Sequence, residues 1–238
     1  LGRLKLAGVA AVSVMMLSFF LDGDRSILPA IALGIAAWLT FGTCLDLYEK
    51  IGFSRLSSDK ILSRLRSLPR STWGTAVAHF SLGVIVAGIT VSSVWQVEKI
   101  QVMKPGETVE IAGYRVIFNG VERVAGPNYT SQRGSFAIFK KTEKIVDLFP
   151  EKRNYPAENS STTEAAIHTN FYSDIYVVLG EPDKTNGWVT RLYYNPLVPW
   201  IWGGAILMAL GGCLSLSDRR LRIGAPRSAS ATSSATTL

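Results

Sequence analysis

A long uncharged apolar run dominates this sequence. Between Trp73 and Trp95 lie 21 residues without Lys, Arg, Asp or Glu, enough to cross a bilayer core of about 30 Å at about 1.5 Å per residue. Comparable apolar windows occupy residues 6–21, 27–45 and 197–216. The pattern predicts a membrane protein of mixed class with four α-helical transmembrane spans, the first two forming a hairpin over residues 1–45.

Charge is distributed unevenly around these spans. The chain has a net charge of +7, which in a soluble protein would suggest nucleic-acid binding. Here the excess lies near the start, in residues 46–72 and in the tail, whereas residues 97–196 hold twelve basic and twelve acidic side chains. Since positive loops stay on the cytoplasmic side, we expect a cytoplasmic 46–72 segment, a cytoplasmic tail and an outer 97–196 segment. We expect no nucleic-acid partner.

The two cytoplasmic segments differ in character. Within residues 46–72, apolar residues from Phe53 to Leu68 recur at helical spacing among basic ones, and Pro69 ends the pattern. This predicts a basic amphipathic helix that lies on membrane lipid or docks on a partner. Residues 217–238 are rich in Ser, Ala and Thr, which predicts a disordered tail.

Residues 96–196 are rich in alternating strand patterns. Asn119-Gly120 predicts one hairpin turn, and two further turns are expected near residues 140–143 and 182–187. Seven or eight short strands in such a segment predict a small antiparallel β-barrel or sandwich inserted before the last span at 197–216. Between the second and third hairpins, residues 150–167 are interpreted as a polar loop.

His79 is an ionisable residue inside the span at residues 73–95. Such residues are costly in a membrane and point to a functional site. Gly83 and Ala87 follow at i+4 and i+8, so they line a shallow groove on the same helical face. The groove permits close packing of another helix, or a flat macrocycle with the imidazole as axial ligand of its metal. The residues alone leave both alternatives open.

Two further groups are candidate sites. His168 is interpreted as a solvated loop histidine, since nothing near it has the spacing of zinc ligands. Lys152 and Arg153 belong to a mixed charge cluster that is either a solvated turn or a contact for an anion or partner, such as a haem propionate.

Seven motifs in order carry a family resemblance between about residues 55 and 222. They read "PRSTWGTAVAHFSLGV", "GPNYTSQRG", "FPEKRNYP", "TTEAAI", "IYVVLGE", "NPLVPWIWGGAILMALGG" and "SDRR". In this order they resemble the C-terminal part of the cytochrome c-type biogenesis proteins of the CcmF family, the haem lyase subunit of bacterial cytochrome c maturation.

The resemblance implies a function and a site. It implies an inner-membrane protein with a periplasmic β-domain, which accepts haem from the chaperone CcmE and attaches it to apocytochrome c, together with the thiol-handling subunit CcmH. It also implies that His79, in the "AH" of the third span, binds the iron of a transmembrane haem b.

The sequence departs from the family pattern as well. The tryptophan-rich segment that handles substrate haem and the second haem b ligand have no counterpart here. We therefore expect a fragment or one half of a split protein, inactive as a lyase without the remainder. The competing hypothesis is a non-catalytic assembly module whose β-domain docks partner proteins. A transporter fragment is disfavoured because one span alone carries an ionisable residue.

Overall fold

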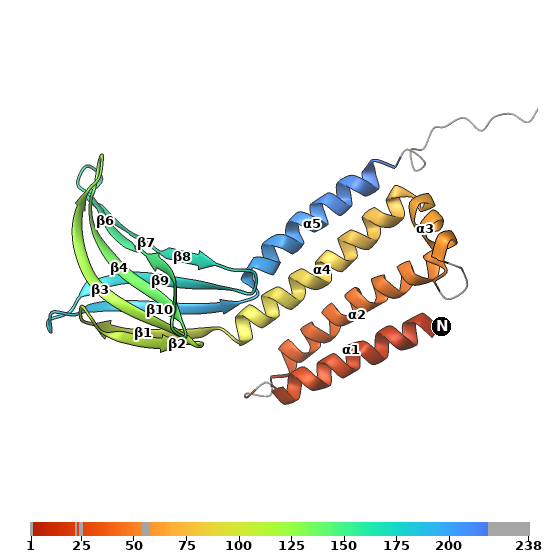
Figure 1. Ribbon diagram of the computed structural model, residues 1–238, viewed down its shortest axis with the longest axis horizontal. Helices are drawn as coiled ribbons and strands as arrows, with labels where there is room; N and C mark the ends of the chain where they lie inside the picture. Colours follow the sequence, from red (N-terminus) through yellow and green to blue (C-terminus); the bar gives the residue numbers. More distant parts are fainter. Residues whose placement is uncertain (1, 22, 24–25, 54–57, 219–238) are drawn as a thin grey trace, which may run out of the picture.

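The computed structural model describes residues 2–21, 23, 26–53 and 58–218. Within these residues, helices gather at one end and β-strands at the other (Figure 1). Of the tail predicted to be disordered, 217–238, residues 219–238 lie outside the described part. Asp218 is described, and it is buried and accepts a hydrogen bond from the backbone N–H of Ser71, so the prediction is wrong at this residue. The helices are α1 (Gly2–Leu21), α2 (Ile27–Ile51), α3 (Ser58–Ser67), α4 (Arg70–Val94) and α5 (Val198–Leu216).

Three helices of the described chain, α2, α4 and α5, are long and apolar enough to cross a membrane. In α1 the apolar stretch Lys5–Leu21 is shorter, so the expected fourth span stays a prediction. The four helices form a row in which α1 packs on α2, α2 on α4, and α4 on α5. The short α3 precedes α4, and Pro69 lies between them as the N-cap of α4.

Glycine faces bring the helices together. A Cβ on Gly74 would lie 2.5 Å from the carbonyl oxygen of Gly211, and a Cβ on Gly211 would lie 2.8 Å from that of Gly74. Farther along the same interface, Gly88 meets Ile201 and Gly204 meets Ile85. In lipid the hydrophobic effect does not favour association of two helices, so the van der Waals contacts that this close backbone approach permits stabilise their packing.

The β-domain is an antiparallel sandwich inserted between α4 and α5 (Figure 1). One sheet has the order β1-β10-β9-β8, and the other has the order β2-β3-β4-β6-β7 with β5 paired to β4. The strands are β1 (Val97–Met103), β2 (Thr108–Ile111), β3 (Tyr114–Ala125), β4 (Thr130–Lys140), β5 (Glu143–Leu148), β6 (Glu151–Tyr155), β7 (Ser160–Glu164), β8 (Ala166–Thr169), β9 (Ser173–Pro182) and β10 (Trp188–Pro196).

The core of the sandwich fills the space between the sheets. Phe118 and Phe136 are fully buried and stack with centroids 4.8 Å apart. Along β9 every second residue, Ile175, Val177 and Leu179, is completely buried. This period of two is what an extended strand imposes when one face is covered.

Two predictions for the β-domain are wrong. Asn119-Gly120 forms no turn, because β3 continues through it with a bulge, where Gly120 adopts φ 126° and the register to β4 shifts. A glycine inside a strand pattern is also typical of bulges. The predicted loop at 150–167 consists largely of β6, β7 and part of β8. The turns expected near 140–143 and 182–187 are confirmed.

Candidate functional site

His79 lies on α4 and its imidazole ring is exposed. Its Nδ1 is 2.8 Å from the backbone carbonyl oxygen of Thr75, one turn earlier. A carbonyl oxygen only accepts hydrogen bonds, so the neutral ring donates its proton from Nδ1 and keeps its lone pair on Nε2. This backbone contact sets both the tautomer and the orientation of the ring, as outer-shell hydrogen bonds do for metal-binding histidines.

The ring borders a small hollow between α2 and α4. The hollow measures about 240 Å³ and is lined by Thr43, Asp46 and Lys50 of α2 and by Thr72 and Thr75 of α4, among others. Lys50 and Asp46 form an ion pair of 2.6 Å across one helical turn. The surroundings of His79 are therefore polar on the α2 side, although both helices are apolar overall.

The predicted groove above His79 is not open at Gly83. A Cβ on Gly83 would lie 3.0 Å from the carbonyl oxygen of Ala36 and would collide with the side chain of Thr40, both on α2. Helix α2 therefore packs against Gly83, which is the first of the two alternatives that the sequence left open for this groove. Ala87, the other expected lining residue, is half-buried. A planar ligand of His79 would have to lie on the exposed side of the ring.

Other possible metal ligands are scarce. The described residues contain no group of three or more His, Cys, Asp or Glu side chains placed to hold a metal ion. His168, the second histidine of the sequence, lies on β8 in the sandwich, not in the predicted loop. The cysteines, Cys44 and Cys213, are free thiols. His79 therefore has no second histidine beside it in the helical region.

Lys152 and Arg153 belong to β6 and have partners within the domain. Lys152 pairs with Glu181 of β9. The guanidinium of Arg153 donates from Nε to Glu151 at 2.9 Å and lies 4.6 Å above the ring centroid of Tyr129. Their charges thus stabilise the sandwich, and an external anion would have to compete with these contacts.

Glu151 is the centre of this cluster. Its carboxylate is buried, and it also accepts from Nε and Nη2 of Arg133, each at 2.7 Å. Burial alone would raise the pKa of Glu151, but the hydrogen bonds from Arg153 and Arg133 outweigh burial and hold the pKa below its usual value. The carboxylate is therefore charged at neutral pH.

Comparison with known proteins identifies the family. A family model described as the CcmF C-terminal beta-sandwich matches residues 94–196. The cytochrome c-type biogenesis protein CycK of Bradyrhizobium diazoefficiens is 41% identical over 229 residues, which are 96% of this chain and 35% of the relative. The CcmF protein of Pseudomonas aeruginosa is 38% identical over 218 residues, 92% of this chain and 32% of the relative. The chain belongs to the CcmF family.

A solved structure agrees with this assignment at the level of the fold. The cytochrome c haem lyase CcmF superposes with a TM-score of 0.65 at 23% identity, covering 90% of this chain and 34% of that one. The chain spans about a third of the length of the CcmF-family relatives that it matches. Membership in the CcmF family and the three apolar helices together indicate an inner-membrane protein.

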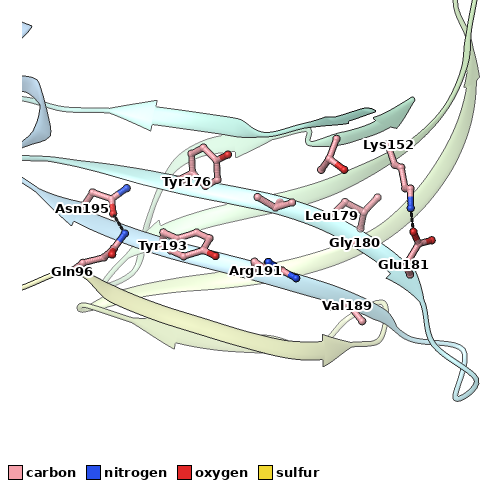
Figure 2. A pocket seen from close by; sticks show the side chains of 12 residues that line it. Gln96, Lys152, Tyr176, Leu179, Gly180, Glu181, Val189, Arg191, Tyr193 and Asn195 are labelled. Atoms are coloured by element: carbon pink, nitrogen blue, oxygen red, sulfur yellow. Dashed lines mark hydrogen bonds and ion pairs between the residues drawn. The ribbon is translucent and has the colours of Figure 1, made fainter. Parts of the chain in front are cut away.

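The described part of this CcmF-family chain also has a hollow in the β-domain that was not predicted from the sequence. It measures about 820 Å³ and lies on β9 and β10, with residues of β6 and β7 along one side (Figure 2). Tyr176, Tyr193 and Arg191 line it. A hydrogen bond to Glu98 raises the pKa of Tyr193. The available signal was the run "IYVVLG", whose residues are apolar on both faces of a strand.

Proposed function

We propose that this chain is the C-terminal portion of a haem lyase that attaches haem to apocytochrome c, and that His79 is one axial ligand of a haem b within the membrane. Its relatives are cytochrome c-type biogenesis proteins, and the structural neighbour is a haem lyase. The observation that carries the proposal is the geometry of His79. An exposed ring on a membrane helix, whose Nδ1 is bonded to the Thr75 carbonyl oxygen so that the neutral tautomer has its lone pair on Nε2, has the form that an axial ligand requires.

The residues present fit one side of such a site. His79 would bind the iron through Nε2, while Thr75 keeps the ring in place. A haem b bound here would supply one-electron redox chemistry. The second axial ligand would come from the rest of the lyase, because the chain has two histidines and the other, His168, lies in the sandwich.

The arrangement of the chain in the membrane belongs to the same proposal. The four spans rest on the four apolar windows of the sequence. The positive-inside rule would place residues 46–72 and the tail in the cytoplasm and residues 96–196 in the periplasm. The sandwich would then face the haem chaperone CcmE, the subunit CcmH and apocytochrome c. The basic helix α3 would lie on membrane lipid, with Arg64 and Arg66 near its end.

Absorption spectroscopy tests the haem assignment. The chain is co-expressed with the remainder of the Bradyrhizobium relative and purified in detergent. The wild type is expected to show a b-type haem spectrum, and His79→Ala is expected to lose it. His168→Ala is the matched control, since it removes the other histidine from the sandwich and should leave the spectrum unchanged. A His79→Ala spectrum identical to that of the wild type would contradict the proposal.

A non-catalytic assembly module is the second candidate function. It is favoured by the sandwich, whose 820 Å³ hollow offers a surface for another protein. This candidate predicts that His79→Ala leaves both the spectrum and cytochrome c maturation intact, whereas changes in the sandwich abolish maturation. The two measurements together therefore separate the candidates.

A further inference from the structure

The outer face of the β1-β10-β9-β8 sheet has an unusual composition. On β9 the residues that alternate with the buried core set are Tyr176, Val178 and Gly180. An antiparallel sheet with one covered face normally carries polar residues on the other. Two neighbouring side chains of β1 on this face, Ile100 and Val102, are 54% and 41% exposed. Apolar side chains therefore take up part of this outer face, beside polar ones such as Glu98, the cross-strand partner of Tyr193.

The hollow follows the strands of this face (Figure 2). Tyr176 and Tyr193 are cross-strand partners whose rings meet edge to face, with centroids 5.6 Å apart. A Cβ on Gly180 would lie 3.0 Å from the carbonyl oxygen of Val189, which is a tight contact. The glycine therefore leaves this part of the hollow without a side chain.

Polar pairs mark the two ends of the hollow. At one end Gln96 donates from Nε2 to Oδ1 of Asn195 at 2.6 Å. At the other, Lys152 pairs with Glu181. Between these ends the side chains on β10 repeat every second residue, a spacing of about 7 Å. That is the spacing at which an extended polypeptide presents its own alternate side chains.

Arg191 is the exposed cation within the hollow. It follows Val189 and precedes Tyr193 on the same face of β10, and it hydrogen-bonds the Tyr193 hydroxyl. Tyrosine and arginine are enriched at protein interfaces, where they provide large contact areas with a polar end. The guanidinium favours a carboxylate as partner.

We propose that this hollow docks an extended segment of another protein, with alternating apolar side chains and one carboxylate opposite Arg191. A second copy of this chain fits less well, because a two-fold contact centred on the hollow would place Arg191 near its own copy. The hollow reaches Glu181 near the end of β9, whereas the strand β9 itself contacts α5 near its start. The hollow therefore extends along β9 away from the helices (Figure 1). The proposal is independent of haem binding at His79.

A charge-swap experiment tests this proposal. The full chain in nonionic detergent is titrated with two fluorescent heptapeptides, Thr-Val-Thr-Glu-Thr-Val-Thr, which places both Val residues and the Glu on one face of an extended strand, and the same peptide with a central Lys. The wild type is expected to bind the Glu peptide about tenfold more tightly. Arg191→Glu should reverse this preference. A gain in affinity for the Lys peptide cannot come from misfolding.

The control is Lys141→Glu, which makes a similar charge change at an exposed turn of the other sheet. It should leave the preference of the wild type unchanged. Failure of both peptides to bind, or a preference that Arg191→Glu does not alter, would overturn the proposal. Light scattering is recorded in parallel. A dimer that Arg191→Glu dissociates would identify a second copy as the occupant and would also overturn it.

Discussion

Replacing Glu151 tests whether its buried carboxylate holds the sandwich together. The side chain is 8% exposed and receives hydrogen bonds of 2.7 Å from Arg133 and 2.9 Å from Arg153. Glu151→Gln keeps the shape but removes the charge, so the two guanidinium groups lose their shared counterion. Arg133 and Arg153 belong to neighbouring strands, β4 and β6. The change therefore weakens the contact between these strands.

The magnitude follows from the exposure of the partners. A hydrogen bond to a charged group contributes about 1.5–3 kcal/mol when it is buried. The side chains of Arg133 and Arg153 are 35% and 30% exposed, so water screens part of this energy. We expect Glu151→Gln to lower the free energy of unfolding by about 2 kcal/mol. For a domain of this size that lowers Tm by about 10 °C.

Thermal unfolding followed by the β-sheet circular dichroism of the chain in detergent measures this effect. The control is Asp147→Asn. It removes an ion pair to Lys144 of 2.8 Å between side chains that are 38% and 50% exposed, and it should change the free energy by less than about 0.5 kcal/mol. Equal shifts for the two variants would refute the reasoning that burial of the carboxylate determines the strength of the pair.

Three further predictions concern the titration of Glu151 and the packing of the helices and strands. The folded-state pKa of Glu151 lies below its ordinary value of 4.5, so the charged carboxylate contributes to the free energy of unfolding above that pH, and this contribution is lost as the pH falls through the lower folded pKa. The wild type should therefore lose more stability on acidification than Glu151→Gln. Equal dependence of the free energy of unfolding on pH in the two proteins would contradict this. Gly211→Leu should destabilise the α4–α5 contact by about 2 kcal/mol in detergent melts, whereas Gly212→Leu, with no atom within 4 Å of a new Cβ, should be close to neutral. Gly120→Ala forces a φ of 126° on a residue with a side chain and should cost about 1–3 kcal/mol by chemical denaturation; a neutral result would mean that the bulge does not persist.

The helical half of the fold was predictable because length and charge are strong signals. A run of 21 uncharged residues admits few structures other than a span, and α4 covers it. The close contact of Gly74 with Gly211 was not predictable, because the sequence of one helix does not show which other helix it packs against. The register of two helices depends on both surfaces at once.

The sandwich shows where local signals fail. Asn119-Gly120 is a strong turn signal, yet long-range pairing of β3 with β4 continues across it. The polar run "SSTTE" has no apolar alternation, but it becomes β7 because β6 offers it an edge. In both cases the pairing with a neighbouring strand, which the stretch itself does not reveal, decided the outcome.

For the candidate site, the sequence identified the residue but not its surroundings. His79 was evident as an ionisable residue in a span, while the orientation of its ring by Thr75 and the filling of the Gly83 face by α2 required the structure. Arg191 gave no signal as a site, because a single cation in a strand is ordinary until its hollow is seen.

The most direct test of the central claim is rescue of the haem spectrum by a free ligand. His79→Gly, co-purified with the remainder of the lyase, should lack the b-type spectrum and regain it when imidazole is added, because imidazole can replace the missing ring at the iron. His168→Gly should need no addition. A b-type spectrum in His79→Gly without imidazole would show that His79 is not an axial ligand and would contradict the account.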